Sequence, residues 1–259
     1  MPRAFWKGVI SFGLVAIPVK MYVGAESKSL SFHLLHKKCL TRPKQVLHCE
    51  TDDEYFGIKE TVRGYEVAKE QYVVLDDSDF EKVPIKTAHS IDILGFVEAK
   101  EVDPIYYYGL HYLEPEVLGA KPFQLLREAL TRTGRIGIGK VTFQRREHLG
   151  CLRPLEDIIV LHTMHYESEI MPRKEITPPE ANISDAELDM AVSLVKAMAK
   201  SFNPKDYQNE YHEAMTKVVE AKIEGRKIIA PVAPKAEIGD LMAALRASIE
   251  AAKKEPAVR

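Results

Sequence analysis

The most informative stretch of the sequence is Arg3-Ala-Phe-Trp-Lys-Gly-Val-Ile-Ser-Phe-Gly-Leu-Val-Ala-Ile-Pro-Val-Lys-Met-Tyr22. It predicts two β-strands joined near Gly13, because its apolar side chains alternate with other residues. One face of the first strand carries Trp6, Gly8, Ile10 and Phe12, and the second strand alternates through Ile17, Val19 and Met21. Pro18 has no N–H to donate, so we expect the second strand to be an edge or to be broken there. The stretch therefore predicts the start of a small sheet or barrel.

The composition is that of a globular protein. The 259 residues are 46% hydrophobic and 29% charged, which allows one well-buried domain with an appendage or two small domains. Three cysteines without regular spacing indicate a reducing compartment rather than a disulfide framework. The apolar runs fall short of the roughly 18 residues that a membrane-spanning helix needs. We expect a cytoplasmic protein, associated in a bacterium with the nucleoid.

The charges are unevenly distributed, although the formal net charge is only −2. Residues 1–46 contain eight Lys or Arg and a single acidic residue, and residues 121–153 contain eight basic and two acidic residues. Between them, residues 47–120 contain six basic and seventeen acidic residues. A strongly positive surface can form if the fold brings the two basic blocks together.

The first basic block includes the run Lys37-Lys-Cys-Leu-Thr-Arg-Pro-Lys44, which follows a predicted strand at Leu30–Leu35. The proline and the absence of acidic residues predict an extended or looping segment. Such a segment could follow the phosphates of a nucleic acid, or it could be a solvated loop. The residues alone leave both readings open.

Four nearby side chains could indicate a zinc site: His36, Cys39, His48 and Cys49. The spacing of His36 and Cys39 is acceptable, but the adjacent His48 and Cys49 would point to opposite faces of a strand. We therefore favour an accidental or vestigial cluster and expect neither a metal nor a cofactor.

The middle of the chain predicts alternating short elements. A helix of about three turns is expected with Pro122 at its first position and Gly134 at its C-terminal cap. A basic turn at Arg145 and Arg146 joins the first two strands of a meander, and the glycines of the first strand predict a bulge or close backbone packing. The remaining expectations are strands at 65–67, 71–75 and 91–96, a helical turn at 79–82, an extended pair at 103–115, and meander strands at 135–144, 149–155 and 158–164.

Two motif-like stretches do not qualify as catalytic or phosphate sites. Gly134–Val141 resembles a P-loop, but it has Val141 in place of the hydroxyl that magnesium needs and runs from a helix into a strand. His212-Glu-Ala-Met-Thr216 lacks the second histidine of a helical zinc pair. The sequence contains no evident nucleophile motif, so we expect a protein that is not an enzyme.

The chain changes character after about residue 170. Prolines mark a linker, and helices are expected at 185–201 and 204–224, followed by a proline-containing spacer at Pro231–Pro234. A last helix at 240–252 places Leu241, Leu245 and Ile249 in register. This helix could dock into a partner's groove or pack on its own protein. We expect a core at 1–170, a helical arm at 171–225, and a spacer with a docking helix at 226–259.

A series of short motifs resembles bacterial Ku, the family of DNA-end-binding proteins of non-homologous end joining. Each motif is weakly specific, but their shared order is highly specific and extends over nearly the whole chain. Besides the opening stretch they are Gln71-Tyr-Val-Val-Leu75, Asp103-Pro-Ile-Tyr106, Tyr112-Leu-Glu-Pro115, Leu125-Leu-Arg-Glu-Ala-Leu130, Thr133-Gly-Arg-Ile-Gly137, Arg146-Glu-His-Leu149, Val160-Leu-His-Thr-Met164 and Asp240-Leu-Met-Ala-Ala-Leu245.

The resemblance implies a mainly β fold: a β-barrel core with an extended bridge at about 32–70, plus C-terminal α-helices. Two copies would form a ring-shaped homodimer around a double-stranded DNA end, protect it in double-strand break repair, and recruit ligase D. The DNA-binding set is His36, Lys37, Lys38, Arg42, Lys44, Arg135, Arg145 and Arg146; the partner-binding set is Leu241, Met242, Leu245 and Ile249. The chain lacks a further cysteine near Cys39 and Cys49 and a long lysine-rich tail.

A function without DNA remains as the alternative. The chain could be a β-barrel scaffold whose partners are proteins, with the basic blocks merely solvated. A hydrolase that uses the histidine-containing strands has no assembled motif behind it.

Overall fold

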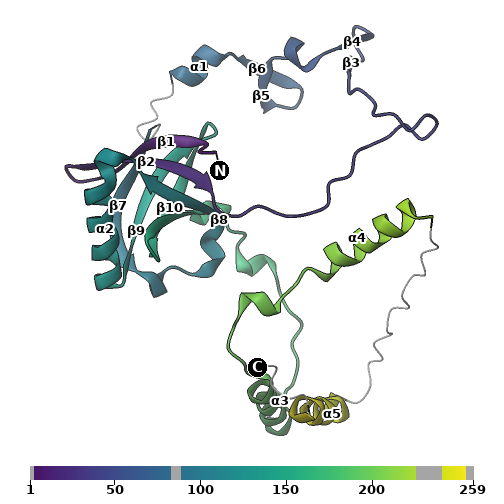
Figure 1. Cartoon of the computed structure of the whole chain (residues 1–259). Helices are drawn as coiled ribbons and strands as arrows, with labels where there is room; N and C mark the ends of the chain where they lie inside the picture. Colours follow the sequence, from purple (N-terminus) through teal and green to yellow (C-terminus); the bar gives the residue numbers. More distant parts are fainter. Residues whose placement is uncertain (1–2, 83–88, 226–240, 255–259) are drawn as a thin grey trace. The chain divides into compact units, whose positions relative to one another are not determined.

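The computed structural model describes residues 3–82, 89–225 and 241–254. The chain divides into two units, one ending at Arg173 and one beginning at Lys174. Seven strands of the first unit close into a barrel in the order β1-β2-β8-β11-β10-β9-β7 (Figure 1), which confirms the prediction of a mainly β barrel fold followed by helices. The strands are β1 (Trp6–Phe12), β2 (Val15–Val23), β7 (Ser90–Glu98), β8 (Tyr107–Pro115), β9 (Arg135–Phe143), β10 (Arg146–Leu155) and β11 (Ile158–Met164).

The barrel closes between its first strand and a strand that lies far along the chain. β1 pairs with β7 in parallel, over Val9–Ser11 and Ser90–Asp92. All other barrel pairs are antiparallel. This parallel pair removes both sheet edges, which a barrel does by complete closure.

The opening hairpin forms as predicted, with β1 and β2 joined through Gly13 at a φ of +59°. Its alternating apolar side chains become the barrel core: Ile10, Ile17, Val19 and Met21 are fully buried. Trp6 is also buried and donates its indole N–H to the carbonyl oxygen of Thr142, 3.2 Å away. The hydrogen bond ties the start of β1 to the end of β9 across the barrel.

Pro18 does not break β2, and β2 is not an edge strand, so the prediction for this position was wrong. β2 runs without interruption between β1 and β8. Its pairing with β8 begins only at Val19, opposite Pro115, and the carbonyl oxygen of Pro18 accepts from the N–H of Glu116 at 2.9 Å. The backbone nitrogen of Pro18, which has no hydrogen to donate, thus faces the side of β2 on which β8 has already ended.

One helix of the first unit, α2 (Ala120–Thr133), packs against β2, β9, β10 and β11. It buries Phe123, Leu126 and Leu130, and ends at Gly134, whose φ of +63° is the left-handed conformation expected of a helix C-cap. A 3₁₀ turn, Val117–Gly119, leads into it from β8. The predicted pair of extended segments at 103–115 is instead one 3₁₀ turn, Pro104–Tyr106, and the single strand β8.

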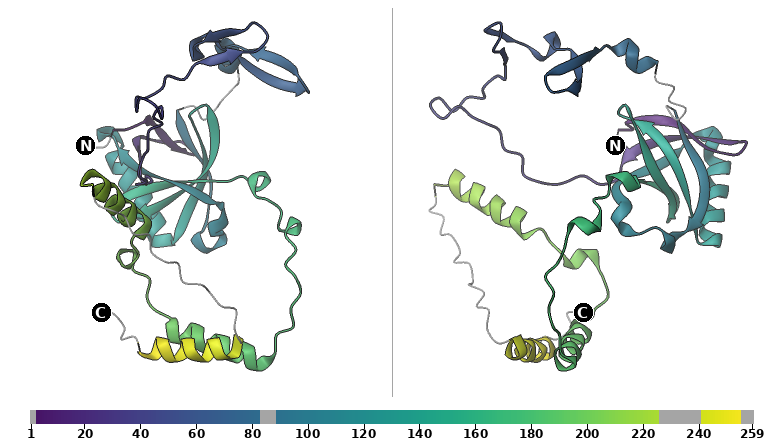
Figure 2. Two further views of the ribbon diagram at one scale, coloured as in Figure 1. Left: turned by 90° about the vertical axis from the view of Figure 1, so that its right-hand side faces the viewer. Right: turned by 180° about the vertical axis from the view of Figure 1, so that it is seen from behind.

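A long segment separates β2 from β7. It contains the hairpins β3 (Leu47–Cys49) with β4 (Glu54–Phe56) and β5 (Arg63–Ala68) with β6 (Gln71–Leu75), and then α1 (Asp77–Glu81), capped by Asp76 (Figure 2). The predicted strands at 65–67 and 71–75 and the helical turn are confirmed. The predicted strand Leu30–Leu35 is absent: this part of the segment is irregular, and Phe32 and Leu34 are exposed.

The second unit is helical, with α3 (Asp185–Met198), α4 (Glu210–Ile223) and α5 (Leu241–Lys254). Ser184 and Glu187, three residues apart at the start of α3, form a capping box. α3 ends three residues earlier than expected, and the second predicted helix is a 3₁₀ turn at Pro204–Asp206 followed by α4. α3 packs against α5. The Pro231–Pro234 spacer lies outside the described residues, and no described helix is long and apolar enough to cross a membrane.

Of the two alternatives for the glycines of β9, a bulge or close backbone packing, the structure supports close packing, since a Cβ on Gly139 would lie 2.5 Å from the carbonyl oxygen of Asp92. A bulge does occur beside them, but it lies in β7, where the register with β9 shifts between Ile93 and Gly95.

Gly139→Ala should lower the free energy of unfolding by roughly 1–3 kcal/mol, because the methyl group forces the backbones of β7 and β9 apart. Gly95→Ala is the matched control, since a Cβ at Gly95 meets no atom within 4 Å. Urea titrations of both variants would measure the difference. Equal stability of the two variants would contradict this account of Gly139.

Candidate nucleic-acid interface

The strand registers bring three separate parts of the first unit to one end of the barrel. β2 ends at Val23, beside the start of β1, and β7 begins beside Val9. β9 is antiparallel to β7, so the turn that follows Phe143 lies at the same end. Residues 24–89 thus leave and rejoin the barrel at the end that carries the β9–β10 turn. We call it the arginine end.

The first basic residues lie in a small loop of the 24–89 segment. The N–H of His36 donates to the carbonyl oxygen of Thr41 at 2.8 Å, and the N–H of Leu40 donates back to the carbonyl oxygen of His36 at 2.7 Å. Leu40 adopts a φ of +56° to complete the turn. The predicted residues of this segment are all exposed: His36, Lys37, Lys38, Arg42 and Lys44. The prediction of a looping basic segment is confirmed.

Cys39 lies within this loop, and its thiol has two polar neighbours. Its Sγ lies 2.9 Å from Oγ1 of Thr41 and 3.0 Å from Nδ1 of His36. Hydrogen bonding by the Thr41 hydroxyl, then by the Thr41 backbone and His36, lowers the pKa of Cys39 to about 7. An exposed thiol with such a pKa is half thiolate at neutral pH and therefore nucleophilic.

Alkylation of Cys39 by iodoacetamide should reach half its maximal rate near pH 7. Thr41→Val should move this midpoint toward the ordinary value of 9.0, because the hydroxyl donor is lost, whereas Thr41→Ser should leave it in place. Peptide mass spectrometry resolves Cys39 from the buried Cys151, whose pKa burial raises. A midpoint near pH 9 in the unchanged protein would refute the assignment.

The second basic site is the β9–β10 turn. The sequence predicts both arginines in a longer turn, but the turn consists of Gln144 and Arg145, and Arg146 is already the first residue of β10. Gln144 and Arg145 have φ values of +52° and +61°, the left-handed pair that two-residue hairpin turns require. Arg145 therefore lies at the tip and Arg146 in the strand.

Both arginines form ion pairs that the sequence does not predict. A carboxylate oxygen of Asp77 lies 3.5 Å from Nη2 of Arg145 and 3.3 Å from Nη1 of Arg63. Arg146 pairs with Glu169, within the 3₁₀ turn Glu167–Glu169. Both pairs are largely exposed, so each adds little stability, but acidic partners offset part of the positive charge at the arginine end.

Arg135 is not grouped with the other predicted DNA-binding residues. It is the first residue of β9, opposite Glu98 at the end of β7, and donates to the carbonyl oxygen of Phe96 at 3.3 Å. A nine-residue strand separates it from the arginine end, a distance of about 25–30 Å. The structure therefore separates Arg135 from Arg145 and Arg146.

The four residues considered for zinc do not form one cluster. His36 contacts Cys39, whereas His48 on β3 contacts Asp53 at 2.9 Å, and Cys49 contacts Asp52. Within the residues that the structure describes, no three His, Cys, Asp or Glu side chains are placed to hold a metal ion.

The predicted partner-binding residues all lie on α5. Met242, Leu245 and Ile249 are half-buried, and α5 packs on α3, whereas Leu241 is 58% exposed. On α3 the apolar residues Leu188, Val192 and Val195 are exposed, so they are not the face that α5 covers. Docking into a partner and packing on its own protein, the two alternatives for the last helix, thus use the same side chains.

Comparisons with known proteins agree with the fold. The family model described as the Ku70/Ku80 beta-barrel domain matches residues 11–190. The chain is 41% identical over 260 residues to the non-homologous end joining protein Ku of Symbiobacterium thermophilum, covering 98% of this chain and 64% of that protein. It is 40% identical over 253 residues to the protein of the same name from Archaeoglobus fulgidus, covering 97% of this chain and 100% of that protein. With Solibacter usitatus the identity is 38%, covering 99% and 98%.

Proposed function

The chain belongs to the Ku family, and on that premise we propose that it binds the ends of double-stranded DNA without reading their sequence, in repair by non-homologous end joining. The observation that carries the proposal is the exposed, acid-free loop from His36 to Lys44, anchored on the barrel end that also carries Arg145 and Arg146. Since the chain spans about two thirds of the length of some relatives, the proposal concerns the part of the protein given by this sequence.

Contacts with phosphates suit a protein that accepts any DNA end, because phosphates carry no sequence information. Lysines and arginines on irregular backbone supply such contacts and release counterions. The helix nearest to the barrel strands, α2, buries its apolar face on the barrel. The proposed binding therefore uses loops and a turn, and it requires no catalytic residue.

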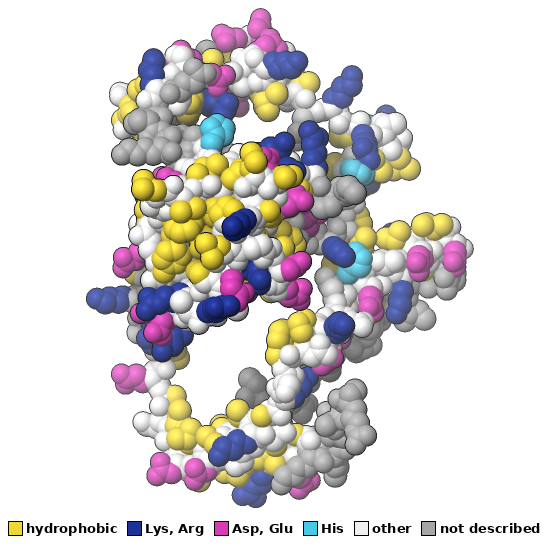
Figure 3. All heavy atoms as spheres, turned by 60° about the vertical axis from the view of Figure 1, so that its left-hand side comes forward, with side chains coloured by type: hydrophobic (Ala, Val, Ile, Leu, Met, Phe, Trp, Pro, Cys, Tyr) yellow, Lys and Arg dark blue, Asp and Glu magenta, His cyan; other side chains and the backbone are white. Residues whose placement is uncertain are grey.

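We further propose that two copies form a ring around the duplex, with residues 32–70 as the bridge. A threaded duplex leaves a closed ring only by sliding off an end. Figure 3 shows hydrophobic side chains gathered on one face of the barrel. Several large apolar side chains of the first unit are more than 70% exposed, which supports a contact of this unit with another protein: Leu14, Val117, Leu118 and Leu125.

Replacement of Lys37, Lys38, Arg145 and Arg146 by glutamate should lower the affinity for linear duplex DNA roughly a hundredfold or more at low salt, because phosphate contacts become repulsive. The matched control reverses Lys100, Lys121, Arg132 and Arg135, which lie in α2 or at the far ends of β7 and β9. Gel-shift assays with linear and closed circular DNA of one sequence would measure both. Equal affinity of the unchanged protein for the two DNA forms would contradict the ring model.

A DNA-free scaffold, the alternative function, makes the opposite prediction. It expects neither set of charge reversals to change a measurable DNA affinity, and a change in binding to a protein partner instead.

Asp77→Asn should raise the affinity for linear duplex DNA several-fold at low salt. The carboxylate of Asp77 is shared by Arg63 and Arg145, and its removal frees both guanidinium groups for phosphates. Asp185→Asn, with the same charge change in the second unit, is the control. The two affinities would be measured by fluorescence anisotropy at several salt concentrations. An unchanged or lower affinity for Asp77→Asn would remove Arg145 from the proposed interface.

We also propose that α5 recruits ligase D through the half-buried face of Met242, Leu245 and Ile249. That face packs on α3, so the ligase would have to displace α3 or bind the exposed Leu241 first. An amphipathic helix that leaves one groove for another is a common mode of peptide recognition.

Leu245→Glu with Ile249→Glu should abolish stimulation of the ligase while DNA binding is retained. Ala244→Glu with Ala247→Glu adds the same charge to exposed positions of α5 and should leave stimulation unchanged. End-joining assays with purified ligase D would compare them. Full stimulation by the first variant would exclude this face of α5 as the docking site.

A further inference from the structure

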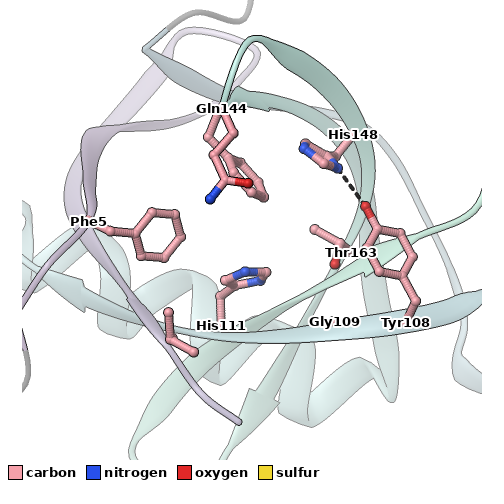
Figure 4. A pocket seen from close by; sticks show the side chains of 9 residues that line it. Phe5, Tyr108, Gly109, His111, Gln144, His148 and Thr163 are labelled. Carbon is pink, nitrogen blue, oxygen red and sulfur yellow. Dashed lines mark hydrogen bonds between the residues drawn. The ribbon is translucent and has the colours of Figure 1, made fainter. Parts of the chain in front are cut away.

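A cavity of about 330 Å³ lies at the arginine end of the barrel (Figure 4). Its walls come from β2, β8, β10 and β11, from the residue before β1, and from the end of β9 with its turn. Its volume falls at the lower end of the range for small-molecule pockets. A cavity of this size would accept one ring of a ligand rather than a whole cofactor.

The cavity contains polar atoms without partners. Among the described residues, the buried side-chain atoms that make no hydrogen bond are Nδ1 of His111, Nε2 of His148 and Oγ1 of Thr163. All three residues line this one cavity, and His148 and Thr163 are only 8% and 1% exposed. Buried polar groups in native proteins nearly always have partners, so three in one cavity indicate an occupant that supplies them.

Local geometry holds two of these atoms toward the cavity. Nδ1 of His148 contacts the hydroxyl of Tyr108 at 2.5 Å, which leaves Nε2 as its free nitrogen. Thr163 lies opposite Gly109 in the β8–β11 pair, and a Cβ on Gly109 would lie 2.2 Å from the Thr163 hydroxyl oxygen. The missing side chain of Gly109 therefore leaves room for this buried hydroxyl at the cavity wall.

The walls favour a flat, uncharged occupant. The ring of Phe143 stacks on His148 at a centroid distance of 4.1 Å, and Phe5 meets Phe143 edge-on at 5.6 Å. Among the residues that the structure describes, no Asp, Glu, Lys or Arg side chain lines the cavity. Burial lowers the pKa of His111 and of His148, and the charge of Arg146 lowers that of His148 further, so both rings are neutral at pH 7. A neutral imidazole can donate from one nitrogen and accept at the other.

The cavity adjoins the candidate phosphate-binding arginines. Gln144 lines the cavity, and the next residue, Arg145, forms the other half of the same turn. An anionic strand that contacts Arg145 and Arg146 would therefore carry its bases past the cavity mouth. Aromatic rings bind such bases by stacking, with little dependence on sequence.

We propose that this cavity binds a single unpaired base at the end of a DNA strand whose phosphates contact Arg145 and Arg146. The inference rests on the proposed function and deepens it, since it assigns the barrel a preference for ends that carry an unpaired nucleotide. Hydrogen bonds come from Thr163, His111 and His148, and the rings of Phe5 and Phe143 supply the aromatic wall.

The test uses duplexes that carry 2-aminopurine as a one-nucleotide 3′ overhang, with blunt duplexes for comparison. The full chain should quench the overhanging 2-aminopurine and bind the overhang at least about fivefold more tightly than the blunt end. Thr163→Val with Gln144→Leu should remove the preference and leave blunt-end affinity unchanged. Thr131→Val with Gln124→Leu, whose groups pair within α2, should behave like the unchanged protein.

Each contrary outcome has its own meaning. Blunt-end binding without an overhang preference overturns the base pocket and leaves the proposed function standing, whereas no binding of either duplex overturns both. Binding of free adenosine, read from the imidazole NMR signals of His111 and His148, without an overhang preference would overturn the strand as the source. A change in oligomeric state of the Thr163→Val, Gln144→Leu protein, without a change in quenching, would assign the cavity to a contact between copies instead.

Discussion

The parallel pairing of β1 with β7 is the constraint on which the rest of the first unit depends. It places Val9 beside Ser90, so the chain that leaves β2 at Val23 must return at the same end of the barrel. The two anchor points are separated by one strand and by about five residues along β1, a distance of roughly 20 Å. Both ends of the excursion between β2 and β7 are thus fixed on the barrel, although most side chains of its described part, residues 24–82, are exposed.

The same register gathers the charged residues. β9 is antiparallel to β7 and ends beside its start, so Arg145 and the excursion share one end of the barrel. Asp77 then links Arg63 in the excursion with Arg145 in the turn. The segment that carries the first basic block and the turn that carries Arg145 therefore start from the same end of the barrel, and Asp77 of the acidic block supplies a counter-charge there. A positive surface forms on this protein only to the extent that these acids leave the arginines free.

Patterns that depend on near neighbours were predictable from the sequence. The alternation in β1 and β2, the Gly134 cap of α2 and the Ser184 capping box each involve residues within a few positions of one another. The strand at Leu30–Leu35 was wrong because alternation gives a segment two faces but does not give it a partner strand. The prediction that Pro18 breaks β2 or makes it an edge strand was wrong for a similar reason. Whether the missing N–H costs a ladder hydrogen bond depends on where β8 ends. No local pattern predicts the ion pairs of Asp77 or the cavity at His111, His148 and Thr163, because they join residues far apart in the chain.

The order of strands in the barrel also constrains how the protein is made. β2 finds its outer partner only when β8 has been synthesised, and β8 in turn pairs with β11, the last strand of the barrel. At ordinary rates of translation the opening hairpin waits on the order of ten seconds on the ribosome before its neighbours exist. During that interval the outer side of β2 is an open edge of the kind that recruits other chains. Pro18 lies on this side, where it withholds one donor from any strand that would add there prematurely.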